Sequence, residues 1–177
     1  MLTADQQKWI DHLSDTDTVK VIPFDPTAEE KFQTVKKLVQ STLGTHVLVE
    51  HHGATSLGIS GQDEIDVYIP ISTSQFDTLL VSIEKLFGKP MSVYPLQRVR
   101  FVTNIADKHI DVFLINENSN NWLDCIKFET HLKNNHDDLD AYRKLKENGN
   151  GLSTREYYRR KIEFINKILL ESSKARQ

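Results

Sequence analysis

The sequence predicts an α+β (α/β) fold, in which a mixed β-sheet is flanked by helices and followed by a helical C-terminal part. Three observations predict this fold. Segments with β-branched residues and apolar–polar alternation occur only before residue 117. Segments with apolar residues at helical spacing separate these strands and then continue alone towards the C-terminus. Hydrophobic residues make up 38% of the 177 residues, which can supply a core for such a fold.

The helices are predicted from apolar spacing and from capping residues. In the second helix, Phe32 and Val35 lie on one apolar face. Thr27 is expected to cap its N-terminus, with Glu30 at the capping-box position, and Gly44 suits its C-terminal end. The predicted helices span residues 3–14, 27–43, 74–87, 122–132, 137–146 and 154–171.

The strands are predicted from alternation. One lies near residues 46–51, one begins at Asp63, and two more span residues 97–103 and 109–115. Pro70 either ends the strand that begins at Asp63 or lies at an edge of the sheet. Residues 104–108 suit a hairpin turn between the last two strands.

The predicted organisation is a single domain with three parts. Residues 1–18 form an N-terminal helix and linker, residues 19–116 form the sheet core, and residues 117–177 form a helical part packed on that core. The length of the chain fits one domain with an appended helical region.

Composition excludes several classes of protein. The net charge of −3 is mild and does not by itself require a nucleic-acid partner, and no DNA partner is indicated. One cysteine, Cys125, excludes an intramolecular disulfide framework and fits a reducing cytoplasm. No apolar stretch approaches the ~20 residues of a membrane span, and the N-terminus lacks the pattern of a signal peptide. The sequence does not indicate an oligomeric state.

The segment from Val47 to Ile71 carries the main functional pattern. A β-branched run enters a Gly-Ala-Thr-Ser turn, and a second Gly/Ser-rich loop precedes the strand Glu64-Ile65-Asp66-Val67. Strand alternation places Glu64 and Asp66 on one face, opposite the apolar residues. Two neighbouring carboxylates repel each other unless solvent or a cation such as Mg²⁺ offsets their charge. The preceding glycines and small hydroxyl residues suit a backbone that approaches a phosphate closely.

A third carboxylate, Asp111, follows the same pattern in a later strand. If Ile110 and Val112 face the core, Asp111 faces the other way and is able to complete a metal site with Glu64 and Asp66. It would hold a metal ion or accept a proton from an attacking hydroxyl group. The alternative is a solvent-facing aspartate on a half-exposed sheet.

Several further residues are candidates for phosphate contacts. Arg98 and Arg100 share a strand face and would clamp a triphosphate, although charge compensation for the acids explains them equally well. His51 precedes the glycine turn, and it would orient the loop through a hydrogen bond or contact phosphate. Cys125 lies in an apolar helical pattern, which favours a buried thiol over a nucleophile.

These motifs resemble those of the nucleotidyltransferase superfamily and, within it, the GrpB family. The resemblance rests on Pro23-Phe24-Asp25-Pro26, Glu50-His51-His52-Gly53-Ala54-Thr55-Ser56, Ile65-Asp66-Val67, and the C-terminal set Tyr157, Lys161, Phe164 and Ile165. It implies a nucleotidyltransferase-like mixed sheet with a C-terminal helical tail. It also implies functional roles for Tyr157 and Lys161, although the neighbouring charges Arg155, Arg159 and Arg160 are typical of a solvated helix face.

The chain departs from the family pattern at three places. Ala54 replaces the usual serine, which removes one hydroxyl contact to phosphate. The loop before the carboxylate strand is one residue shorter and lacks a Lys-Pro pair. Asp111 stands where many related chains carry histidine. The first departure counts against catalysis, whereas the other two restore a three-acid pattern.

The resemblance implies transfer of a nucleoside monophosphate from a nucleoside triphosphate to an acceptor hydroxyl or amine. Catalysis and metal binding are assigned to Glu64, Asp66 and Asp111, with Mg²⁺ or Mn²⁺ as cofactor. Nucleotide and phosphate binding is assigned to His51, Gly53, Thr55, Ser56, Arg98, Arg100, Tyr157 and Lys161. The acceptor remains open among small molecules, RNA and protein. The alternative function is a non-catalytic nucleotide-, phosphate- or partner-binding module with the same fold.

Overall fold

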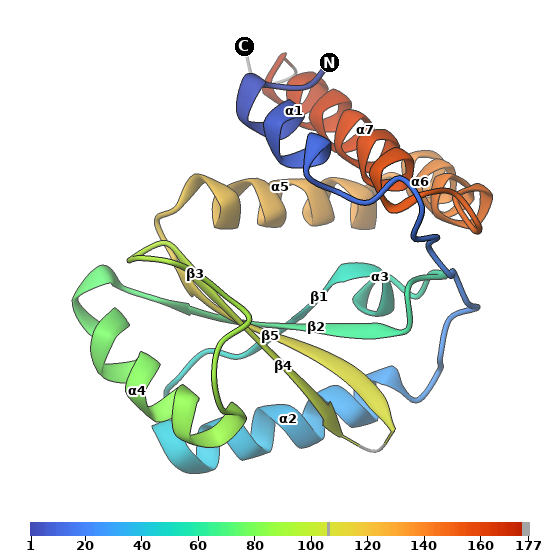
Figure 1. The fold of residues 1–177 in the computed structure, drawn as a ribbon. Helices are drawn as coiled ribbons and strands as arrows, with labels where there is room; N and C mark the ends of the chain where they lie inside the picture. The colour runs from blue at the N-terminus through green and yellow to red at the C-terminus, as the bar shows by residue number, and fades with distance from the viewer. Residues whose placement is uncertain (106, 175–177) are drawn as a thin grey trace. The chain divides into compact units, whose positions relative to one another are not determined.

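A computed structural model describes residues 1–105 and 107–174 of the chain (Figure 1). The chain divides into two compact units. One comprises Met1–Pro23, Ser60–Gln62 and the chain from Ile126 onward, and the other comprises Phe24–Ile59 and Asp63–Cys125. We call them the helical unit and the sheet unit. The predicted hairpin turn includes residue 106, and the predicted C-terminal part includes residues 175–177; these positions lie outside the described residues.

The elements agree with the predicted mixture of strands and helices. The helices are α1 (Ala4–Asp11), α2 (Ala28–Leu43), α3 (Gly53–Ser56), α4 (Phe76–Phe87), α5 (Asn120–Asn134), α6 (His136–Asn148) and α7 (Thr154–Lys174), with a 3₁₀ turn η1 (Thr73–Gln75) before α4. The strands are β1 (Glu50–His52), β2 (Glu64–Ile71), β3 (Ser92–Tyr94), β4 (Arg98–Ile105) and β5 (Lys108–Asn116). The predicted α+β class is confirmed.

The sheet unit is built on a five-stranded mixed sheet with the order β1-β2-β5-β4-β3 among the described residues. Strands β2 and β5 pair in parallel, and the remaining neighbours pair antiparallel. Pro70 stays within β2, opposite Ile115 of β5, while the pairing with β1 stops at Tyr68. Pro70 therefore lacks a ladder partner on the side of β1, as the edge interpretation predicted.

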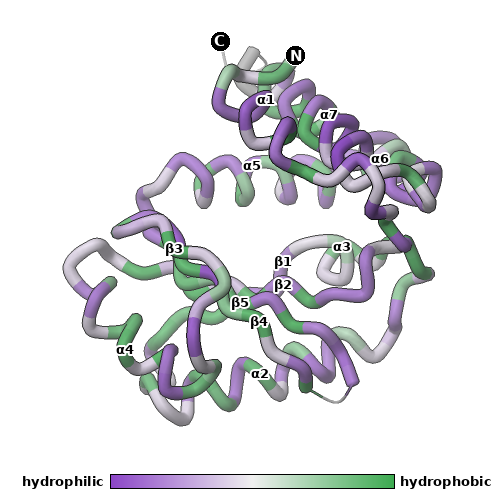
Figure 2. Tube along the Cα trace, viewed as in Figure 1, coloured by the Kyte–Doolittle hydropathy of each residue, from purple (hydrophilic) through white to green (hydrophobic). Residues whose placement is uncertain are grey.

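One face of the sheet carries the hydrophobic core. Alternation turns Ile65, Val67 and Ile69 of β2 to this face, together with Ile110 and Val112 of β5, and all are buried. Helices α2 and α4 cover the same face through their apolar sides (Figure 1). Figure 2 shows hydrophobic stretches in α4 and in the strands. The opposite face, called the polar face below, carries the acids and His109 near the start of β2 and β5, and the rings of Tyr68 and Phe113 further along.

In the helical unit, α1 packs against α7 and α6 also packs against α7. The rings of Trp9 and Tyr158 form a T-shaped contact, with centroids 5.5 Å apart. Phe128 and Phe164 surround the ring of Tyr142. These contacts bring the first and last helices of the described chain together within one unit (Figure 1).

One local prediction is wrong, and one strand was missed. Thr27 makes no side-chain capping bond at the start of α2. Instead, the carboxylate of Asp25 accepts hydrogen bonds from both the backbone N–H and the hydroxyl of Thr27, an Asx-type turn that occupies the threonine. The short strand β3 (Ser92–Tyr94) was not predicted, because its three half-exposed or exposed residues have no alternating pattern to recognise. In the described part of the chain, every helix is too short or too polar to cross a membrane.

Candidate functional site

The polar face of the sheet brings the predicted acids together. The parallel register of β2 and β5 pairs Asp66 with Asp111 and Glu64 with His109. Side chains of paired residues point to the same side of a sheet, so these four residues form two adjacent rows. On the other side of β2, His52 is paired with Asp66. The prediction that both carboxylate strands lie in one sheet is confirmed.

Glu64, His109 and Asp111 form a group of possible metal ligands on this face. Their ligand atoms all lie within 4.8 Å of one another. His109 Nε2 lies 3.2 Å from Asp111 Oδ1. The side chain of Asp111 is only 6% exposed, whereas that of His109 is 41% exposed. The group thus combines a buried carboxylate with an imidazole that solvent reaches, which suits a divalent cation entering from outside.

Arg100 is the charge partner of Asp111. Its Nη2 atom lies 2.9 Å from Asp111 Oδ2 and 3.0 Å from Oδ1. A buried carboxylate without such a partner is costly, so this ion pair offsets the burial of Asp111. The compensating role considered for Arg100 is therefore realised in the structure, and its contact with phosphate stays a prediction.

Arg98 has different neighbours from Arg100, although the two share a face. Its guanidinium carbon lies 5.0 Å from the ring centre of Tyr94 and 5.8 Å from that of Phe113. The ring of Phe113 in turn stacks on Tyr68, with centroids 4.6 Å apart. Arg98 therefore lies beside a row of aromatic rings, a cation–π arrangement.

The glycine turn is fitted to Asp66. Gly53 has φ +78°, a conformation that favours glycine, and a Cβ atom built there would lie 2.0 Å from Asp66 Oδ2. Only a residue without a side chain leaves room for this carboxylate. The small hydroxyl residues of the turn make local contacts: Ser56 Oγ donates to the carbonyl of Gly53 at 3.0 Å, and Thr55 Oγ1 lies 2.9 Å from His51 Nε2.

His51 faces the helix-covered side of the sheet. Its ring stacks on Phe32 at 4.8 Å, and its Nδ1 atom lies 2.9 Å from Glu29 Oε2. The hydrogen bond from Gln33 and then the contact with His51 lower the pKa of Glu29 below its usual value. Since the other ring nitrogen contacts Thr55, His51 connects α2 to the glycine turn, in agreement with its predicted orienting role.

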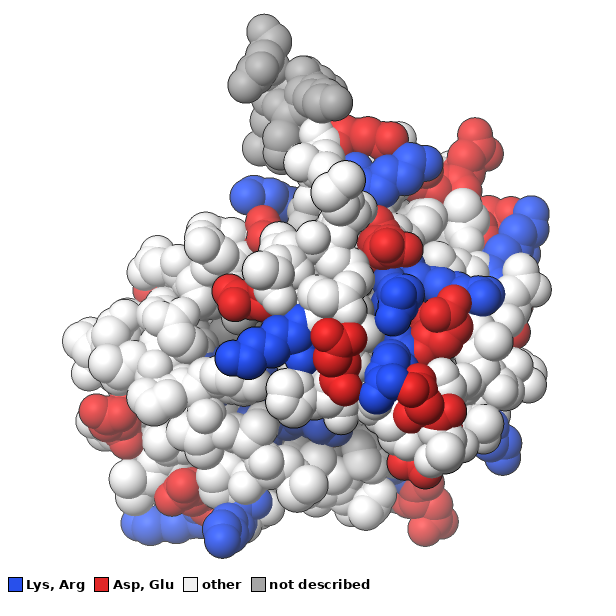
Figure 3. All heavy atoms as spheres, turned by 45° about the horizontal axis from the view of Figure 1, so that its top comes forward, with Lys and Arg blue, Asp and Glu red and all other residues white. Residues whose placement is uncertain are grey.

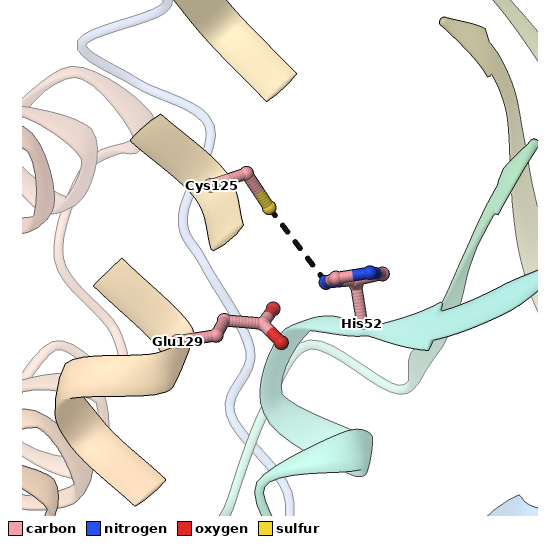
Figure 4. A group of neighbouring side chains, drawn as sticks. All are labelled: His52, Cys125 and Glu129. Carbon is pink, nitrogen blue, oxygen red and sulfur yellow. Dashed lines mark hydrogen bonds between the residues drawn. The ribbon is translucent and has the colours of Figure 1, made fainter. Parts of the chain in front are cut away.

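His52 faces the polar side and was not predicted as a site residue. Its Nε2 atom lies 3.1 Å from Glu50 Oε2, and its Nδ1 atom lies 3.8 Å from the sulfur of Cys125 (Figure 4). The rings of Tyr68 and Trp122 each form a T-shaped contact with the imidazole ring of His52, with centroids 5.1 Å apart. Cys125 is half-buried rather than buried. Sequence reasoning missed this contact because it depends on how the start of α5 packs on the sheet.

A second unpredicted cluster holds the N-terminal ends of α2, β2 and β5 together. The ammonium of Lys108, which is 4% exposed, contacts the carboxylates of Asp63 and Asp25. Asp25 also accepts a hydrogen bond from Lys31. The bonds from Thr27 and Lys31 hold the pKa of Asp25 well below its usual value. Since Asp63 precedes Glu64 and Lys108 precedes His109, this cluster fixes the strand ends beside the acids.

Tyr157 and Lys161 belong to the helical unit, whereas the other candidate residues belong to the sheet unit. Tyr157 is 1% exposed, and a Cβ atom on Gly149 would lie 2.5 Å from its ring. The ammonium of Lys161 lies 5.3 Å from the ring centre of Tyr158. Close packing against Gly149 thus explains, within the helical unit, why the ring of Tyr157 is buried.

The basic stretch of α7 is paired with acids. Arg159 and Arg160 both contact Glu156, and Arg155 contacts Asp15. Figure 3 shows acidic and basic side chains intermixed on the face that it draws. The interpretation of this stretch as a solvated helix face agrees with these contacts.

Comparisons with known proteins agree with the fold. A model of the GrpB protein family matches residues 18–171. Among solved structures, the crystal structure of the conserved protein GrpB from Enterococcus faecalis is similar, with a TM-score of 0.69 and 23% sequence identity over 88% of this chain and 98% of that chain. At this identity the structural likeness concerns the fold. No curated protein matches the chain.

Proposed function

Because the chain belongs to the GrpB protein family, we propose that it is a metal-dependent nucleotidyltransferase. It transfers a nucleoside monophosphate from a nucleoside triphosphate to an acceptor hydroxyl or amine. The observation that carries the proposal is the parallel register of β2 and β5, which sets Asp66 beside Asp111 and Glu64 one row away. Three carboxylates on adjacent positions of one sheet face are an arrangement that a divalent cation stabilises.

The proposed metal ligands are Glu64, Asp66 and Asp111, with Mg²⁺ or Mn²⁺ as the ion. The donor set fits such an ion, because carboxylate oxygens are the ligands that it prefers and because Glu64 and Asp111 already have ligand atoms within 4.8 Å of each other. When bound, the metal would polarise the α-phosphate and stabilise the leaving pyrophosphate.

The surrounding residues hold the substrate. Arg100 and Arg98 lie on the same strand face as the acids and would donate hydrogen bonds to the triphosphate. Gly53, Thr55 and Ser56 would approach it from the glycine turn, which His51 orients through its hydrogen bond to Thr55. Contacts from Tyr157 and Lys161 belong to the same proposal, carried only by the family resemblance.

The reaction is a substitution at phosphorus. The acceptor oxygen or nitrogen forms a bond to the α-phosphorus, and the bond from that phosphorus to the bridging oxygen of pyrophosphate breaks. One of the clustered carboxylates accepts the proton that the acceptor loses. The acceptor is a small molecule, an RNA end or a protein side chain.

The second candidate function is a non-catalytic nucleotide- or phosphate-binding module. Two observations favour it. Ala54 stands in the glycine turn where the family resemblance implies a serine hydroxyl, and the carboxylate of Asp111 is engaged by Arg100. A module of this kind would use the arginines for phosphate and leave the acids without a catalytic role.

A nucleotide screen separates the two functions. The thermal unfolding of the protein is followed with each nucleoside triphosphate and Mg²⁺ or Mn²⁺, and pyrophosphate release is measured in the same samples with a mixture of acceptors. A nucleotidyltransferase shows stabilisation and release, and both require Asp66. The matched control is Asp17→Asn, which removes an exposed carboxylate from the helical unit. Stabilisation that never leads to release supports the binding module.

A further inference from the structure

His109 stands beside the predicted acids but lies outside the three-carboxylate set. It is the second residue of β5, two positions before Asp111, so strand alternation turns both side chains to the polar face. The register with β2 places it directly beside Glu64. His109 is therefore a neighbour of both carboxylates, of Glu64 across the strand pair and of Asp111 along its own strand.

The distances allow these three side chains to share one ion. Their ligand atoms lie within 4.8 Å of one another. Two ligands of one ion, at bonds of about 2.1 Å, lie roughly 3–4 Å apart. Closing the group around an ion thus requires small rotations of the side chains, and the 41% exposure of His109 gives its ring room for them.

Imidazole changes which ion the site prefers. Mg²⁺ favours oxygen ligands and dehydrates reluctantly, whereas imidazole nitrogen suits first-row transition metals. A set of two carboxylates and one imidazole is therefore better matched to a transition metal than three carboxylates are. Asp66 stays outside this group of ligand atoms, and its Oδ2 atom lies against the glycine turn, 2.0 Å from the position that a Cβ of Gly53 would take.

We propose that His109 is a metal ligand together with Glu64 and Asp111, and that this site binds a first-row transition-metal dication, with Mn²⁺ as the test ion, in preference to Mg²⁺. The inference rests on the metal dependence in the proposed function and changes its ligand set. Arg100, which contacts both oxygens of Asp111, is the cation that the metal must displace or accompany. Its side chain is 36% exposed and has solvent to move into.

The test uses Mn²⁺ alone with the full chain and no nucleotide. Pulsed electron paramagnetic resonance detects the nitrogen of an imidazole bound directly to Mn²⁺, and calorimetry gives the affinities for Mn²⁺ and Mg²⁺. We expect the nitrogen signal in the wild type. It should be absent in His109→Gln, and Mn²⁺ affinity should fall at least tenfold. Mg²⁺ affinity should change less than about threefold.

Two further variants sharpen the result. His109→Asp keeps a ligand but removes the nitrogen, so it should retain Mn²⁺ without the nitrogen signal and bind Mg²⁺ more tightly than the wild type does. His136→Gln removes an exposed imidazole from the helical unit and should leave all of these measurements unchanged. The circular dichroism and melting temperature of each variant establish that it is folded.

The outcomes separate this inference from the proposed function. Mn²⁺ bound without a nitrogen signal in the wild type, or equal losses of Mn²⁺ and Mg²⁺ affinity in His109→Gln, would overturn it even if pyrophosphate is released. A nitrogen signal that depends on His109, with no pyrophosphate release under any condition, supports the inference and counts against the transferase. If the wild type binds no Mn²⁺, the inference is wrong.

Discussion

The contact between Gly53 and Asp66 makes a quantitative prediction about stability. An alanine Cβ at position 53 would lie 2.0 Å from Asp66 Oδ2, although real contacts of this kind stay beyond about 3 Å, and φ is +78°. The left-handed conformation costs a non-glycine residue about 1–2 kcal/mol. Displacing the carboxylate adds about 1–3 kcal/mol, the usual range for overpacking. Gly53→Ala should therefore lower the free energy of unfolding by roughly 2–5 kcal/mol.

A double-mutant cycle separates the two contributions. In an Asp66→Ala background the carboxylate is gone, and the remaining Cβ of residue 66 lies 3.3 Å from the new methyl group. Gly53→Ala should then cost only the backbone term, about 1–2 kcal/mol. Urea unfolding of the four proteins measures the coupling energy, which we expect to be about 1–3 kcal/mol.

Gly58→Ala is the matched control for the backbone term. Gly58 also has a positive φ, +69°, but a Cβ there meets nothing within 4 Å. Its substitution should cost about 1–2 kcal/mol in either background. If the effects of Gly53→Ala and Asp66→Ala add to within about 0.5 kcal/mol, the carboxylate does not need the glycine. The fit of the turn to Asp66 would then be refuted.

Three further predictions concern charge. Asp66→Asn should leave the free protein equally stable or slightly stabilised, because repulsion among the acids falls. When Mg²⁺ and nucleotide are added, the melting temperature of the variant should rise less than that of the wild type. Equal shifts would mean that the carboxylate does not contribute to ligand binding. The pKa of Asp25 is lowered in the folded state, so its stabilising charge acts above about pH 4 and is lost as pH falls further. Asp25→Asn weakens the charge-assisted hydrogen bonds from Thr27 and Lys31 and should be about 1 kcal/mol less stable at pH 7. The difference should shrink towards pH 2 in urea unfolding; a constant difference contradicts this account. Arg100→Met removes the arginine partner of buried Asp111 and should cost about 2 kcal/mol, the usual penalty of leaving a buried acceptor short of a hydrogen bond. Mn²⁺ should restore part of this loss in a melting experiment; no greater stabilisation by Mn²⁺ than in the wild type would argue against a metal contact with Asp111.

The fold was predictable where its signals are local. Alternation in β2 and β5 identifies the core face from residues such as Ile65 and Val112, and the apolar spacing of α2 and α4 identifies the helices that cover it. The order of the strands in the sheet cannot be predicted from local patterns, because it depends on pairing between segments that are far apart in the sequence. The short β3 has no recognisable pattern, and its existence follows from its pairing with β4.

The sequence predicted which site residues share a face of the sheet, but not which side chains contact each other. Strand alternation placed Arg98 and Arg100 on one face of the sheet. The register between strands then decides that Arg100 contacts Asp111, whereas Arg98 lies over Tyr94 and Phe113. The same alternation places His109 on the face of Asp111, so the sequence alone was sufficient to identify His109 as a candidate. His52 differs, because its contact with Cys125 requires the packing of a distant helix on the sheet.

The transferase and the binding module differ in one physical quantity, the ability of a dication to compete with Arg100 for Asp111. The ion pair is short, and the carboxylate is almost inaccessible to solvent, so the metal-free protein already compensates this charge. A dication offers twice the charge and gains two further ligands from Glu64 and His109, whereas Arg100 loses a contact that it can replace with solvent or phosphate. If the competition favours the metal, the displaced guanidinium is left on the same sheet face as the ion, where a triphosphate would carry its compensating negative charge. Metal and nucleotide binding would then strengthen each other, and a site that appears neutralised in the free protein would be the resting form of a catalytic one.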